Sequence, residues 1–111
     1  MNDSAKIHDA IERVKAGELK RPTNCVHMDL IHPDVEPAAA GCVDCLASGS
    51  TWVHLRVCLT CGYTGCCNSS PNKHANKHAT ETGHHVVMSM ENGEEWMWCY
   101  EDEDFIIPRR R

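Results

Sequence analysis

The sequence has few aromatic residues, no long apolar run and no excess of basic residues. Only six of its 111 residues are Trp, Tyr or Phe, so apolar burial needs help from another source to hold one domain together. No stretch is apolar for long enough to span a membrane, and residues 1–20 lack the apolar segment of a secretory signal. We therefore expect one domain, located in the reducing cytoplasm.

The net charge does not suit a nucleic-acid-binding protein. It is formally −5 at pH 7 with neutral histidines, and an acidic domain is repelled by phosphate backbones and attracted to basic partners. Residues 108–111 form a short basic tail, which we interpret as a solvated end. We expect a monomer whose partner is a protein, with no binding to nucleic acid or membrane.

Cysteine and histidine, in contrast, are abundant, with eight residues of each. They are densest in residues 58–84, which contain four cysteines and three histidines. Cysteines alone could indicate disulfides in a secreted protein, but thiols interleaved with imidazoles at these spacings are the ligands that a four-coordinate zinc ion requires. The stretch is therefore predicted to bind metal.

One motif in this stretch has the spacing of a DNA-binding finger, namely Cys-x2-Cys-x12-His-x3-His beginning at Cys58. That finger also needs an aromatic residue and a leucine for its small core, and the corresponding positions here hold Gly65 and Pro71. Pro71 would interrupt the recognition helix. The spacing therefore does not indicate a DNA-binding finger.

The apolar periodicity predicts a small α+β domain. Ile7, Ile11 and Val14 have helical spacing, which predicts an amphipathic helix over residues 4–16. Residues 28–41 are loop-like, and a second helix is expected over residues 72–80. Strands are expected over residues 51–57, 85–90, 96–100 and 105–107, with a turn at residues 91–95.

The order of the ligand motifs resembles the UBP-type zinc finger. A Cys-x-His pair begins at Cys25, Cys-x2-Cys pairs begin at Cys42 and Cys58, and a Glu-Thr-Gly-His segment ends at His84, before the final Trp-Cys-Tyr. This family is a ubiquitin-binding module of ubiquitin-specific proteases and one histone deacetylase, and the chain looks closest to its short, stand-alone bacterial members. The resemblance covers residues 24–107, after an N-terminal helix and linker over residues 1–23.

The resemblance implies a twisted antiparallel sheet with flanking helices and cross-braced zinc sites. Carried over to this chain, it implies three zinc ions. The ligand sets would be Cys42, Cys45, Cys66 and His74; Cys58, Cys61, His78 and His84; and Cys25, His27, Cys99 and Asp102.

Two of these ligands have alternatives. The family spacing after Cys61 selects Cys66, whereas the spacing before His74 selects Cys67; we choose Cys66. Asp102 stands where the family has a cysteine. A carboxylate is an acceptable zinc ligand, and the alternatives are His32 or a water, with Asp102 as an acidic surface residue.

A binding surface is predicted at residues 96–100. In a strand, the alternation of side chains puts Trp96, Trp98 and Tyr100 on one face and Cys99 on the other. The resemblance implies that Trp98 and Tyr100 line a pocket that captures the free C-terminal Gly-Gly of ubiquitin. The alternative is that these aromatic side chains belong to the core.

The predicted pocket departs from the family at one point. In the family, an arginine and then an aromatic residue follow the cysteine that corresponds to Cys66 or Cys67. This chain has Asn68, Ser69 and Ser70 there. Asn68, Ser69 and Arg56 are the remaining candidate hydrogen-bond donors for a peptide. The acidic residues 101–104 beside the pocket predict a preference for basic tails.

The motifs for catalysis are missing. A metalloprotease helix needs a glutamate directly after its first histidine, and His74 is followed by Ala75. Two of the expected zinc sites also have four protein ligands, which leaves no open position for water. We therefore predict a non-catalytic zinc-binding module that recognises a free C-terminal peptide tail. The alternative is a metal- or redox-responsive regulator in which the thiolates themselves act.

Overall fold

The computed structural model describes residues 3–67 and 69–110. Its elements surround one five-stranded antiparallel sheet with the strand order β2-β1-β3-β4-β5, so the predicted α+β class is confirmed. In chain order they are α1 (Asp3–Lys15), the 3-10 turn η1 (Met28–Leu30), α2 (Val43–Ser48), β1 (Leu55–Cys58), β2 (Thr64–Cys66), α3 (His74–Thr82), β3 (Val86–Ser89), β4 (Met97–Cys99) and β5 (Asp104–Ile106).

The strand register gives the sheet one buried face and one partly open face. Val57 pairs with Met88, Met88 with Met97, and Met97 with Ile106, so one row of apolar side chains crosses four strands. All four side chains are buried. The neighbouring row contains Val87, Trp98 and Phe105 and faces the opposite side, because side chains alternate along a strand.

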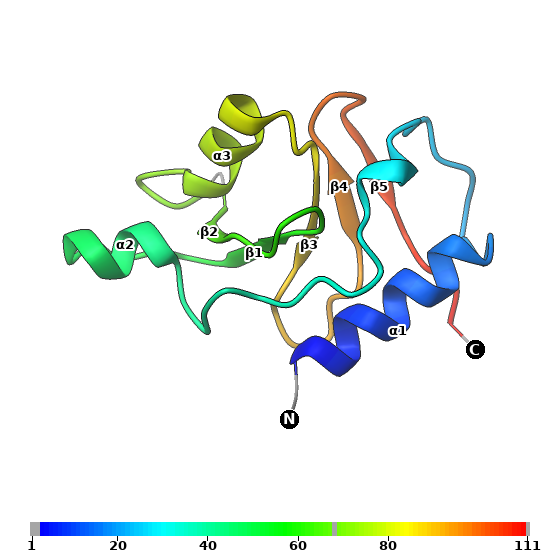
Figure 1. Cartoon of the computed structure of the whole chain (residues 1–111), viewed down its shortest axis with the longest axis horizontal. Coiled ribbons are helices and arrows are strands. Elements are labelled where there is room, and N and C mark those ends of the chain that lie inside the picture. Colours follow the sequence, from blue (N-terminus) through cyan, green and yellow to red (C-terminus); the bar gives the residue numbers. More distant parts are fainter. Residues whose placement is uncertain (1–2, 68, 111) are drawn as a thin grey trace.

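Helix α1 covers the buried face. Ile7, Ala10, Ile11 and Val14 share one side of the helix and join the same apolar core as Val57 and Met88. Figure 1 shows α1 running across β4 and β5, with α2 and α3 at the far end of the sheet. The helix predicted over residues 4–16 is therefore confirmed to within one residue at each end, and it forms part of the main core.

An ion pair fastens α1 to the sheet. Arg13 is only 3 % exposed, and its guanidinium lies 2.9 Å from the Asp9 carboxylate, one turn earlier. It also pairs with Glu95, in the segment between β3 and β4. Lys6 adds a hydrogen bond to the carbonyl oxygen of Glu91 at 2.8 Å. Because a buried charge is costly without a partner, these pairs fix the position of α1.

The predicted elements differ from the observed ones mainly around the cysteines. The strand expected over residues 51–57 is shorter, because β1 begins only at Leu55 and His54 is exposed outside it. Lys73 adopts a left-handed conformation (φ 50°) and delays the start of α3 to His74. The short elements α2 and β2 were not expected, since six and three residues carry too little periodicity to be recognised.

None of the helices in the described ranges combines the length and the apolarity needed to cross a lipid bilayer.

Candidate metal centres and aromatic pocket

The first cluster joins α2, β2 and α3. It contains Cys42, Cys45, Cys66 and His74, whose ligand atoms lie within 4.8 Å of one another. The His74 Nδ1 atom is 3.2 Å from the Cys42 sulfur, 3.3 Å from that of Cys45 and 3.5 Å from that of Cys66. The backbone N–H of His74 also donates to the Cys66 sulfur at 3.1 Å, an interaction that favours a thiolate.

The second cluster contains Cys58, Cys61, His78 and His84, also within 4.8 Å. Cys58 ends β1, and Cys61 lies in the turn that follows. That turn requires Gly62, whose φ is 87° and where a Cβ atom would lie 2.0 Å from the Glu36 carbonyl oxygen. Gly83 ends α3 in a left-handed conformation. The chain therefore turns back toward the Cys58–Cys61 pair, and the His84 Nδ1 atom lies 3.7 Å from the Cys58 sulfur.

The third cluster lies beside η1 and contains Cys25, His27, Cys99 and Asp102. The Asp102 carboxylate is 2.9 Å from His27 Nδ1 and 3.5 Å from the Cys99 sulfur. A hydrogen bond from the Val26 backbone N–H is the largest effect that lowers the pKa of Asp102, so this side chain is an anion near neutral pH. His32 is not a member of the cluster; its Nδ1 atom accepts a hydrogen bond from the backbone of Asp34.

The first two clusters have a cross-braced arrangement. Along the chain, the ligand pairs alternate between them: residues 42 and 45 join 66 and 74, whereas residues 58 and 61 join 78 and 84. His74 and His78 lie one turn apart on α3, so one short helix serves both clusters. A metal in each cluster would connect the last residues of β1 and β2, Cys58 and Cys66, to α3.

The spacing of ligand atoms in the first two clusters fits tetrahedral zinc, whereas the 2.9 Å between Asp102 and His27 Nδ1 in the third cluster is a hydrogen-bond distance. Typical bonds of about 2.3 Å to sulfur and about 2.0–2.1 Å to nitrogen place neighbouring ligand atoms roughly 3.3–3.8 Å apart. The sulfurs of Cys45 and Cys66 are 3.9 Å apart and Cys61 is 3.3 Å from His78 Nε2. A disulfide would need sulfurs about 2.05 Å apart, and all eight cysteines are free.

The protonation of the ligands supports the same interpretation. Burial raises the pKa of Cys58 to about 11 and that of Cys99 to about 12, so without a cation these thiols hold their protons. Burial lowers the pKa of His78, which keeps its imidazole neutral and able to bind metal. A zinc ion would compensate the thiolate charge that burial otherwise disfavours.

The two adjacent cysteines point to different places. Cys66 belongs to the first cluster, whereas the Cys67 sulfur is 3.6 Å from the Ser70 hydroxyl and lies outside all three clusters. Although burial acts to raise the pKa of Cys67, its hydrogen bond with Ser70 and the nearby Arg56 charge help to lower it to about 7.

A pocket of about 220 Å³ opens on the face of the sheet that carries Val87, Trp98 and Phe105, opposite the face covered by α1. We call it the aromatic pocket. It is lined by Arg56, Cys67, Ser69, Val87, Trp96, Trp98, Tyr100 and Phe105. The predicted candidates Arg56, Ser69, Trp98 and Tyr100 thus come together, while Asn68 lies outside the described residues. Trp98 and Phe105 contact edge to face, with ring centroids 4.8 Å apart.

The aromatic pocket differs from the sequence prediction in its charge. The Arg56 guanidinium carbon lies 4.5 Å from the centre of the Trp96 ring, so the cation approaches from β1. None of the acidic residues 101–104 lines the pocket. Asp102 belongs to the third cluster, and Asp104 accepts a hydrogen bond from the Asn24 backbone at 2.8 Å. The expected preference for basic tails is therefore not supported.

Some residues of these sites were not recognised from the sequence. Phe105 and Val87 line the aromatic pocket because the strand register places them beside Trp98. The alternation of side chains in the strand predicted over residues 105–107 could have indicated that Phe105 lies on the same face as Trp98. Tyr63 stacks on the His78 ring at 4.3 Å and hydrogen-bonds to Asp44. It thus orients a ligand of the second cluster, and no pattern in the sequence indicated this contact.

Three Cys/His-rich clusters around a small antiparallel sheet define a zinc-finger module. Comparison with known proteins identifies the particular family. The family model described as "Zn-finger in ubiquitin-hydrolases and other protein" (zf-UBP) matches residues 42–111. The chain therefore belongs to the UBP-type zinc-finger family.

The similar proteins include both large enzymes and a small domain. The chain is 32 % identical over 76 residues to ubiquitin carboxyl-terminal hydrolase 44 of Ailuropoda melanoleuca, covering 68 % of this chain and 10 % of that protein. It is 38 % identical over 61 residues to ubiquitin carboxyl-terminal hydrolase 16 of Rattus norvegicus, covering 51 % and 6 %. The chain thus spans a tenth or less of these curated relatives.

A solved structure resembles most of the chain. The solution NMR structure of protein RPA1320 from Rhodopseudomonas palustris superposes with a TM-score of 0.71 at 45 % sequence identity. The match covers 79 % of this chain and 85 % of that one. The similarity to the hydrolases is therefore confined to a small part of each enzyme, whereas the similarity to RPA1320 extends over nearly a whole small domain.

Proposed function

We propose that this zinc-binding module holds three zinc ions and recognises a free C-terminal peptide tail in the aromatic pocket. The observation that carries the proposal is the pocket itself, in which aromatic walls surround one cation, Arg56. A terminal carboxylate needs a cation or several N–H donors, and the last residues of a tail need a narrow apolar channel.

Arg56 would bind the carboxylate in place of the family arginine, whose position in this sequence is occupied by residues 68–70. Its guanidinium lies over Trp96 and donates a hydrogen bond to the Leu55 carbonyl oxygen at 2.9 Å, which fixes its position. Ser69 offers a hydroxyl at the rim. The terminal carboxylate of a bound peptide would pair with Arg56. The peptide backbone that precedes it would lie between Trp98 and Tyr100.

The proposed zinc ions are structural, and the module is not an enzyme. Each cluster has four candidate protein ligands, so a bound zinc would keep no open position for a water nucleophile. The zinc would instead fix the segments that carry the aromatic pocket. Cys66, in the first cluster, is followed directly by Cys67, which lines the pocket.

A second candidate function rests on Cys67. Cys67 is buried but lines the aromatic pocket and belongs to no cluster. Although burial acts to raise its pKa, its hydrogen bond with Ser70 helps to lower the pKa to about 7. A small oxidant that enters the pocket would therefore meet a partly ionised thiol. In that case the chain would be a redox-responsive regulator. Titration with hydrogen peroxide distinguishes the two: a peptide-binding module retains its zinc under mild oxidation, whereas a regulator releases zinc or changes partner at a defined step.

Calorimetry tests the proposed function with ubiquitin, because proteins named as ubiquitin hydrolases are among the relatives. Intact ubiquitin is compared with ubiquitin lacking its last two glycines, and a short peptide with a free Gly-Gly end with its amidated form. We expect binding only with a free carboxylate. Equal binding by the paired ligands, or no binding by any of them, would contradict the proposal.

Trp98→Ala is the matching variant of the protein. Truncating a central aromatic residue costs about 2 kcal/mol or more, roughly 30-fold in affinity. Zinc content should be unchanged, because Trp98 and Cys99 face opposite sides of β4. Loss of zinc in Trp98→Ala, measured by native mass spectrometry, would instead mean that this tryptophan supports the core.

A further inference from the structure

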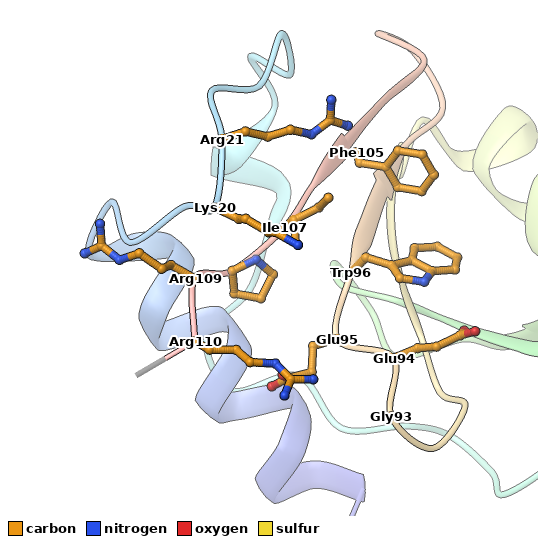
Figure 2. Close-up of a pocket in the computed structure, with 11 residues that line it drawn as sticks. Lys20, Arg21, Gly93, Glu94, Glu95, Trp96, Phe105, Ile107, Arg109 and Arg110 are labelled. Atoms are coloured by element: carbon orange, nitrogen blue, oxygen red, sulfur yellow. The ribbon is translucent and has the colours of Figure 1, made fainter.

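A second and larger cavity, of about 780 Å³, adjoins the aromatic pocket. We call it the basic groove. It lies between the segment after α1, the loop before β4 and the chain after β5, as Figure 2 shows. Its lining is Lys20, Arg21, Gly93, Glu94, Glu95, Trp96, Phe105, Ile107, Pro108, Arg109 and Arg110. Trp96 and Phe105 line both cavities, so the two form one continuous surface.

The floor of the basic groove is apolar. Trp96 precedes β4 and Ile107 follows β5, and together with Phe105 they lie on the outer face of the sheet. Phe105 is 37 % exposed, and its ring contacts Trp96 edge to face at 5.4 Å. Trp96 and Ile107 are partly buried, so Phe105 is the most exposed of these three side chains.

The rim of the groove is basic. Figure 2 shows the side chains of Lys20 and Arg21 reaching across the groove toward Ile107 and Phe105. The backbone of Lys20 is held in place, since its N–H donates to the Ile107 carbonyl oxygen at 2.8 Å. Arg21 lies 3.7 Å from Asp104 and remains half exposed. Within the described residues, no hydrogen bond or ion pair involves the Lys20 ammonium.

The two carboxylates of the groove are already engaged. Glu95 pairs with the buried Arg13 and lies 3.9 Å from Arg110. Glu94 accepts a hydrogen bond from the Ser89 hydroxyl at 2.5 Å. The cations that face the groove are therefore Lys20 and Arg21, of which Arg21 is half exposed beside Asp104. Figure 2 shows the Arg109 side chain directed away from Trp96 and Phe105.

We propose that the basic groove binds the upstream part of the same peptide whose end enters the aromatic pocket, and that it selects acidic residues interspersed with apolar ones. This inference rests on the proposed function. Trp96 and Tyr100 flank β4 and lie four residues apart, about 13 Å in an extended chain, so the groove would receive residues about four to six positions before the carboxylate of an extended tail. Lys20 and Arg21 would pair with the acidic side chains there, and Trp96 and Phe105 would contact the apolar ones.

An acidic peptide fits this surface better than a nucleic acid does. Aromatic rings beside cations also suit single-stranded nucleic acid. A long polyanion, however, would be repelled by the negative net charge of the chain. It would also lie close to the carboxylates of Glu94 and Glu95, which would repel it further. A short segment with two or three carboxylates meets only the basic edge.

The experiment uses fluorescence anisotropy with two short peptides that share a free Gly-Gly end. One carries glutamate and leucine upstream, and the other carries lysine and leucine at the same positions. We expect the acidic peptide to bind about fivefold more tightly at low salt, and the difference to shrink at high ionic strength because salt screens exposed charges.

Lys20→Gln/Arg21→Gln is the test variant, and Lys15→Gln/Lys77→Gln is its control. Both variants remove two exposed positive charges, but Lys15 and Lys77 do not line the groove. The test variant should lose the preference for the acidic peptide, whereas the control should keep it. Both should retain binding that depends on the free carboxylate.

The outcomes separate the two proposals. If neither peptide binds in any protein, the proposed function itself fails. If both peptides bind through their carboxylates without preference, or the control variant loses the preference equally, the basic groove does not read the upstream residues. A single-stranded oligonucleotide that binds more tightly than the acidic peptide, and loses affinity in the test variant, would overturn the inference in favour of nucleic acid.

Discussion

The two ends of the sheet are held together in different ways. The end under α1 has a core of fourteen buried residues, including Ile11, Met88 and Ile106. At the α2 and α3 end, the described residues form a second core of four buried side chains, Cys42, Cys45, Leu55 and Cys66. Three of those four are members of the first cluster. Figure 1 shows how far this end extends from α1.

The difference shows where metal substitutes for apolar burial. Among the fourteen buried residues under α1, two belong to a metal cluster, Cys25 and Cys99, so apolar burial contributes most of the stability at this end. The α2–α3 end cannot rely on apolar burial to the same extent, because its helices are short and α3 buries only two alanines, Ala75 and Ala79. Isolated helices of this length do not persist in water. The α2–α3 end should therefore depend on zinc much more than the α1 end does.

Metal removal should have the largest effect and should reveal this difference directly. Zinc binding contributes about 10–16 kcal/mol to the folding of small zinc domains, so a strong chelator should unfold α2 and α3. Hydrogen exchange should show loss of protection in residues 74–82 before residues 86–89 and 97–99. Native mass spectrometry before chelation should count three zinc ions. Simultaneous loss of protection in all these segments would contradict the comparison.

The adjacent cysteines offer a smaller and more local test. Cys66→Ser should lose one zinc and destabilise the α2–α3 end, because a weak oxygen donor replaces a thiolate in the first cluster. Cys67→Ser should keep all its zinc, since its sulfur contacts Ser70. Metal content and thermal unfolding of the two variants decide. The reverse result would mean that Cys67 is the ligand.

Ile11→Ala tests the apolar end in the same manner. Ile11 is 2 % exposed, and its truncation should lower the free energy of unfolding by about 2–4 kcal/mol through lost burial and a cavity. Zinc content should stay the same. The control is Glu12→Ala, an exposed position on the same helix. Urea denaturation measures both variants, and a loss of zinc in Ile11→Ala would show that the two ends are not independent.

Asp102→Asn should have the smallest effect, limited to the third cluster. A neutral amide binds zinc more weakly than a carboxylate, so the affinity of one site should fall about tenfold or more, while the other sites keep their zinc. Asp102→Cys should strengthen that site, because a thiolate is the softer ligand. Competition with a chromophoric chelator measures both. No change in either variant would mean that Asp102 is only a surface carboxylate.

Much of the architecture could be predicted from the sequence because local rules decide it. The spacing of Ile7, Ile11 and Val14 predicted α1, and alternation at residues 96–100 predicted which side of β4 carries the tryptophans. The resemblance to a known family selected the same twelve residues that the fold gathers into three clusters. Short elements such as α2 and β2 were missed, since six and three residues carry too little periodicity to be recognised.

The sequence by itself determined the abundance and order of the candidate ligand residues, the acidic charge and the period of the main helix and strands. Only the tertiary structure decided that Cys66 enters a cluster while Cys67 faces the aromatic pocket. It also decided that Arg56 lies over Trp96 and that Lys20 and Arg21 border the same outer face. The physical reason is that these neighbours come from different strands and loops. Their meeting depends on the strand register and on how the chain after α1 lies against β5.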